Sequence, residues 1–167
     1  SGEIDRAVDC YKQQILLSQE NGSVDIEAIG TANLGYLYSK LGEFQNSIQY
    51  QNQALDYFRA QKISYYQAAL LGNLGNVYLE SGINYQLSAF LDKSINNLEN
   101  QDAYFAQTIK SELLEPVLID RNSVETAITN YKTCLEIAKE IRDFRIEGSV
   151  LGNLGAAYYL LENIDSS

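Results

Sequence analysis

The residue types that most enzymes use for catalysis are scarce in this chain. Its 167 residues include no histidine, which excludes catalytic triads, imidazole bases and histidine metal sites. Its two cysteines, Cys10 and Cys134, are too far apart in the sequence to predict a thiolate metal site. Of the 22 acidic residues, Glu112 and Glu115 form a pair that could in principle act as acid and base, but carboxylates on helices usually form a solvated face. We therefore expect no enzymatic activity, no metal site and no cofactor.

The glycines form a repeat and not a phosphate-binding loop. Gly72-Asn73-Leu74-Gly75 lacks the lysine of such a loop and falls in a predicted helix, where N–H groups are already used. The string Leu-Gly-Asn-Leu-Gly occurs at 71–75 and again at 151–155, with a weaker copy at 31–35. Its asparagines are thus 40 and then 80 residues apart. A fixed period in this range predicts a repeat architecture, in which each unit buries its apolar face on its neighbours.

Each 40-residue unit contains two stretches of apolar residues at helical spacing. We expect first helices at 25–41, 64–81, 103–120 and 144–161, and second helices at 3–19, 44–61, 84–100 and 123–141. The turn within a unit is expected at Gly2, Gly42 and Gly82, and at Asn122 in the third full unit, because these residues tolerate a left-handed conformation. The predicted fold is all-α, a right-handed α-solenoid of about eight helices in antiparallel pairs.

The period also predicts how the chain is divided. We expect a single domain over 1–167, made of a half repeat 1–22, repeats 23–62, 63–102 and 103–142, and a half repeat 143–167. The third full repeat is irregular, because Pro116 falls inside its first helix and is expected to kink or break it near Leu113. We expect the chain to be a fragment of a longer protein. Its two terminal half repeats are complementary, so they could pack end to end between molecules.

Charge and hydropathy narrow the range of partners. The net charge of −10 and the pI near 4.4 argue against nucleic acid and against anionic membrane surfaces. No apolar run is long enough to span a bilayer. The charge either serves solubility alone or favours basic or mixed-charge partner segments. An internal disulfide is not expected, because repeats separate the two cysteines, and two free thiols suit a reducing, cytoplasmic location.

The small and aromatic residues of the units resemble those of the tetratricopeptide repeat family. The matching residues are Leu34-Gly35-Tyr38 followed by Ser47 and Ala54, and then Leu74-Gly75-Tyr78. The period of 40 departs from the usual 34, and the family's tryptophan and closing proline are missing. The chain is most similar to the long Leu-Gly-Asn type, as in a spindle-orienting scaffold, kinesin light chains and bacterial signalling arrays.

The resemblance implies that the first helices line a concave groove. The asparagine before each Leu-Gly would point into it and hydrogen-bond the backbone of a bound peptide. Residues three and seven positions further along share that face. The implied peptide-binding residues are Asn33, Tyr36, Lys40, Asn73, Asn76, Glu80, Asn153 and Tyr159, with Ala156 and Leu160 beside the last two.

Two functions remain open. The first is a protein–protein interaction scaffold that binds an extended or helical peptide segment in the groove, which would end at the irregular third repeat and so span Asn33 to Asn76. The second is a purely structural or assembly module that spaces or oligomerises attached domains, in which the asparagines only fix contacts between adjacent helices.

Overall fold

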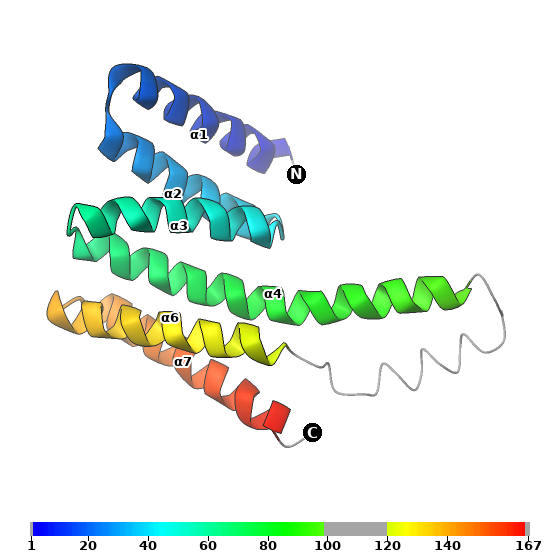
Figure 1. The fold of residues 1–167 in the computed structure, drawn as a ribbon. Helices are drawn as coiled ribbons and strands as arrows, with labels where there is room; N and C mark the ends of the chain where they lie inside the picture. Colours follow the sequence, from blue (N-terminus) through cyan, green and yellow to red (C-terminus); the bar gives the residue numbers. More distant parts are fainter. Residues whose placement is uncertain (1, 99–119, 166–167) are drawn as a thin grey trace.

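The computed structural model describes residues 2–98 and 120–165, and of residues 83–98 it describes the backbone alone. These residues form helices stacked one on the next, with the two ends of the chain at opposite ends of the stack (Figure 1). The described parts contain no strand, so the prediction of an all-helical fold is confirmed for them. The helices are α1 (Gly2–Asn21), α2 (Val24–Lys40), α3 (Phe44–Ala60), α4 (Ser64–Leu98), α6 (Arg121–Glu140) and α7 (Phe144–Asp165).

Two layers arise from this stacking. Each helix packs against the next along the chain, and α2 also contacts α4, as α4 contacts α7. Because of these contacts, α2, α4 and α7 lie side by side in one layer. These three helices contain the three copies of the Asn-Leu-Gly string. The helices α1, α3 and α6 form the other layer. The pairing expected of a tetratricopeptide-like helical repeat is thus present.

The turns between the helices share one backbone conformation and one hydrogen-bond pattern. A single residue with positive φ follows each of four helices: Gly22 (68°), Gly42 (75°), Lys62 (57°) and Arg142 (57°). The next residue donates its N–H to a carbonyl five positions back, as in Ser23 to Ser18 (2.8 Å) and Asp143 to Ala138 (3.0 Å). This is the Schellman arrangement, which satisfies the last carbonyls of a helix.

The turn predicted at Gly82 is wrong. Position 82 continues the 20-residue series of left-handed positions at 22, 42 and 62, yet α4 runs through it to Leu98. The second half of α4 projects beyond the other helices (Figure 1). Gly82 serves packing instead, because a Cβ there would lie only 2.8 Å from the Cβ of Ser123.

The helix count therefore differs from the expected eight. Most of the range 84–100 belongs to α4, and the helix expected at 103–120, with its kink at Pro116, lies outside the described residues but for its last position. The turn expected at Asn122 is also wrong, because Asn122 is the second residue of α6. As a result α6, and not the segment after Gly82, is the helix that packs on the first half of α4.

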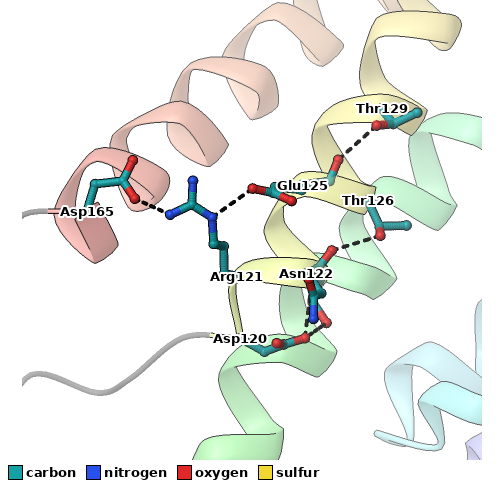
Figure 2. A network of polar contacts seen from close by, with 8 residues as sticks. Asp120, Arg121, Asn122, Glu125, Thr126, Thr129 and Asp165 are labelled. Carbon is teal, nitrogen blue, oxygen red and sulfur yellow. Dashed lines mark hydrogen bonds and ion pairs between the residues drawn. The ribbon is translucent and has the colours of Figure 1, made fainter.

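A side-chain cap and two ion pairs fix the beginning of α6 (Figure 2). The Asp120 carboxylate accepts hydrogen bonds from the N–H (3.0 Å) and the hydroxyl (2.6 Å) of Ser123, which lower the pKa of Asp120. The neighbouring Arg121 pairs with Glu125 on the same helix and with Asp165 at the end of α7. These contacts join the first turn of α6 to the last turn of α7.

The larger of two apolar clusters extends from α2 to α7. Its fully buried members include Leu55, Phe58, Leu74 and Tyr131, which come from α3, α4 and α6. A smaller cluster around Leu34 and Tyr38 joins α1 to α2. Within the described residues, no helix is long and apolar enough to cross a membrane.

Candidate functional site

A groove lies between α4 and α7, with α6 beneath it. Its volume is about 260 Å³, and α4 and α7 supply nearly all of its walls. Small side chains keep it open, because Ala68, Ala69 and Gly72 face it from α4 and Ser149 from α7. The full lining consists of Tyr65, Ala68, Ala69, Gly72, Asn73, Asn76, Cys134, Arg145, Ile146, Ser149, Val150 and Asn153.

Three of the predicted asparagines meet in this groove. Asn153 on α7 donates from Nδ2 to Oδ1 of Asn76 on α4 (3.0 Å), and the Tyr131 hydroxyl on α6 donates to the same oxygen (2.7 Å). The Asn76 carbonyl group thus ties three helices together. Asn73, one turn earlier on α4, is half-buried and makes no side-chain hydrogen bond to another described residue. Its amide donor and acceptor are therefore open to a ligand in the groove.

The other predicted site residues lie elsewhere. Asn33 is half-buried on α2, while Tyr36 on that helix is 45% exposed and holds the Lys40 ammonium 5.1 Å above its ring centre. Glu80 is exposed on α4 beyond the groove, and Tyr159 is 66% exposed on α7. The structure therefore brings together Asn73, Asn76 and Asn153, and it separates them from the remaining five.

The electrostatics of the groove favour binding over reaction. Cys134 is fully buried at its base, its sulfur lies 3.1 Å from the Ala68 carbonyl oxygen, and burial raises the pKa of the thiol to about 11. Burial and the nearby charge of Glu80 also raise the pKa of Tyr131. Both groups stay protonated and neutral near pH 7, so neither is an activated nucleophile. Arg145 at the rim is the only formally charged residue of the lining.

The described residues offer no alternative metal centre, since no three of their cysteine, aspartate and glutamate side chains are arranged to hold an ion. A second hollow adjoins the groove, shares Tyr65 and Arg145 with it, and is extended by Arg142 and the exposed Phe144. The groove thus has neutral amides along its length. At one end Arg142 and Arg145 lie beside Asp143, whose carboxylate pairs with Arg145 (3.5 Å).

Sequence reasoning missed the half of the groove that precedes each asparagine. Tyr65 and Ala69 lie eight and four residues before Asn73, on the same face of α4. Likewise, Ser149 lies four residues before Asn153 on α7. Extending the helical face backwards as well as forwards would have found them. Tyr131 and Cys134 carry no such signal, because they reach the groove from the other layer.

Comparison with known proteins agrees with this arrangement. The pattern that defines the tetratricopeptide repeat matches residues 32–61, which cover the end of α2, the left-handed turn at Gly42 and all of α3. A tetratricopeptide repeat is present there. The detected repeat contains Asn33 and Gly35, the residues whose copies on α4 are Asn73 and Gly75. The 40-residue Leu-Gly-Asn type is a finer assignment than this match makes.

Two curated proteins resemble the chain more distantly over most of its length. Both are named outer dynein arm-docking complex subunit 4, one from Mus musculus and one from Homo sapiens. Each is 20% identical over 156 residues, which cover 93% of this chain but only 24% and 23% of those proteins. The chain therefore spans about a quarter of the length of these relatives.

Proposed function

We propose that this chain is a protein-interaction scaffold, and that the groove between α4 and α7 binds an extended segment of a partner protein. Tetratricopeptide repeats generally mediate protein–protein interaction, and the detected repeat supports that class of function. The observation that carries the proposal is the amide of Asn73, open to the groove beside the Asn76–Asn153 pair. Amide side chains suit a peptide backbone, because each supplies both a donor and an acceptor.

The lining favours a particular kind of segment. Ala68, Gly72 and Val150 leave room for a small apolar side chain. At one end Arg142 would accept an acidic group, whereas Arg145 already pairs with Asp143. The net charge of −10 of the whole chain favours basic flanking residues. The partner segment is therefore of mixed charge, and the site covers Asn73, Asn76 and Asn153 without Asn33.

The finer parts of the scaffold are also proposals. They are a right-handed solenoid, in which α2 and α3 form the repeat 23–62, and a cytoplasmic location. The resemblance to a docking complex subunit favours a related role in assembly, in which the bound segment belongs to another subunit of a larger complex.

Selection from a phage library of natural protein segments tests the proposal. We expect peptides enriched on the wild-type chain to lose at least tenfold in enrichment on Asn73→Ala, because one donor and one acceptor are removed from the groove. Asn46→Ala is the matched control, since Asn46 is exposed on α3 and bonds only Glu43 within the described structure (2.7 Å). Equal enrichment on Asn73→Ala and Asn46→Ala would contradict the proposed site.

A further inference from the structure

The groove between α4 and α7 is closed at one end and open at the other. At the closed end Asn153 and Asn76 bond to each other across the two walls (3.0 Å), and no described residue of α4 or α7 beyond this pair lines the groove. At the other end Tyr65 and Arg145 belong both to the groove and to the second hollow. A bound segment longer than the groove therefore continues into this hollow.

The second hollow lies at the turn between α6 and α7 and is called the turn hollow below. Its volume is about 520 Å³, and it is lined by Tyr65, Ile141, Arg142, Asp143, Phe144 and Arg145. The turns before α4 and before α7 lie at the same edge of the stack, so that Tyr65 on α4 completes this lining (Figure 1). The turn hollow thus belongs to two units of the stack and not to one loop.

One positive charge in the turn hollow has no partner. The Asp143 carboxylate accepts hydrogen bonds from the backbone N–H groups of Arg145 (3.0 Å) and Ile146 (3.1 Å), and the Arg145 guanidinium lies 3.5 Å from it. The side chain of Arg142 is exposed and makes no hydrogen bond or ion pair with another described residue. Asp143 and Arg145 therefore balance each other, and the Arg142 guanidinium is left to pair with a carboxylate from outside.

The turn hollow also has an apolar wall. Phe144 is 78% exposed and Tyr65 is 46% exposed. The exposure of Phe144 belongs to its position in the repeat, because Val24 at the same position of α2 is 50% exposed although α1 and α3 both pack on α2. An unpaired guanidinium beside two exposed aromatic rings suits an acidic residue that has a large apolar neighbour.

The helix α7 fixes the spacing between the turn hollow and the groove. Phe144 and Val150 are six residues apart on α7, which at a rise of about 1.5 Å per residue separates them by about 9 Å. An extended chain advances about 3.3 Å per residue, so about three residues span this distance. Val150 lines the part of the groove that leaves room for a small apolar side chain. Because Arg142 lies two residues before Phe144, a carboxylate on Arg142 is three or four residues from that small side chain.

We propose that the turn hollow binds a second part of the same partner segment, which carries an aspartate or glutamate three or four residues from the small apolar residue held at Val150. The carboxylate pairs with Arg142, and a large apolar residue beside it covers Phe144. This inference rests on the proposed function, since it requires a segment in the groove. It adds the sequence pattern by which that segment is recognised.

A phage library of random twelve-residue peptides is the probe, selected separately on the wild type, Arg142→Gly and Lys62→Gly. Lys62→Gly is the matched control, because Lys62 has the same φ of 57°, precedes α4 as Arg142 precedes α7, and lines neither the groove nor the turn hollow. Each variant loses one positive charge, and glycine adopts this left-handed conformation readily, so both should keep their turn.

Peptides enriched on the wild type and on Lys62→Gly should carry an acidic residue three or four positions from an alanine, serine or valine. On Arg142→Gly this pattern should be lost. In fluorescence anisotropy, one such peptide should bind Arg142→Gly about threefold to fivefold more weakly than wild type, which is the contribution of an exposed ion pair. Exchange of the peptide's acidic residue for its amide should weaken binding to the wild type by the same factor and leave binding to Arg142→Gly unchanged.

Phe144→Ser tests the apolar wall, because serine is the residue that α4 has at this position, Ser64. Binding of the same peptide should weaken at least threefold, whereas Val24→Ser on α2 should have no effect. Loss of binding on Asn73→Ala together with equal binding to the wild type and Arg142→Gly would overturn this inference and leave the proposed function standing. Binding that is insensitive to Asn73→Ala, or no enriched peptide at all, would overturn both.

Discussion

Gly75 and Gly155 end the two copies of the Leu-Gly-Asn-Leu-Gly string, yet adding a side chain at these two positions should change the stability of the fold in opposite directions. At Gly75 a Cβ would overlap the fully buried ring of Tyr131, so Gly75→Ala should destabilise the fold by ~1–3 kcal/mol through overpacking. At Gly155 the same methyl group meets no described atom, so Gly155→Ala should stabilise by up to ~1 kcal/mol through helix propensity. Urea unfolding at low protein concentration measures both. A loss of stability at Gly155 as large as that at Gly75 would contradict this difference in packing.

The buried thiol of Cys134 should make the free energy of unfolding fall as the pH rises into the alkaline range. Its pKa is about 11 in the folded chain against an ordinary 9.0, so the unfolded chain releases its proton first as the pH rises. The thiol's contribution is complete below pH 9 and falls as the pH passes from 9 to 11. By linkage, unfolding should become easier by ~1.4 kcal/mol between pH 7 and pH 10.

A matched variant isolates the thiol. Cys134→Ala should be less stable than wild type at pH 7 because it leaves a cavity, but its stability should fall less by pH 10. Parallel pH profiles for the two proteins would show that the thiol is not the titrating group. Tyr131 adds only ~0.4 kcal/mol to the loss by pH 10 and more above it, because its pKa is raised from an ordinary 10.0.

At the level of the helices, two turns hold a left-handed residue that is not glycine. Lys62 and Arg142 have φ of 57°, a conformation that is unfavourable for residues with a Cβ. Lys62→Gly and Arg142→Gly should each stabilise the chain by ~1 kcal/mol or less, since relief of this strain exceeds the added freedom of the unfolded chain. Thermal unfolding measures the change. Gln53→Gly, at an exposed position inside α3, is the control and should lose about that amount.

Helix positions were predictable because the pattern repeats. The periodic leucines and glycines predicted the ranges of α2, α3 and α7 to within a few residues. The failure at Gly82 has a physical cause. A glycine that ends a helix and a glycine that allows a neighbouring helix to pack closely look identical in a sequence. Gly82 is of the second kind because it packs against Ser123, which lies 41 residues later in the chain.

The candidate site was predictable in part for the same reason. Asn73, Asn76 and Asn153 followed from one helical face and one period, and they do meet in the groove. The groove's base did not follow from the sequence, because Tyr131 and Cys134 reach it from α6. Which helix lies beneath α4 depends on the packing of residues distant in the chain.

For the whole molecule, the pairing of α4 with α6 has a consequence for the order of folding. Apart from the contact of α2 with α4, the contacts among α1, α2, α3 and α4 join helices that are consecutive in the chain, with turns of two or three residues between them. The contact between Gly82 and Ser123 must instead bring together two residues that 40 others separate in the sequence. Chain closure over that separation costs ~2 kcal/mol more entropy than closure of a three-residue turn.

The segment from α1 to α4 should therefore form first, and α6 and α7 should dock on it later as one unit joined by Arg121 and Asp165. Pulse-labelling hydrogen exchange during refolding can follow this order. Amides of α2 and α3 are expected to gain protection before those of α6 and α7, and simultaneous protection of all four helices would contradict it. The groove, which needs α4, α6 and α7 together, would then be the last part of the molecule to acquire its shape.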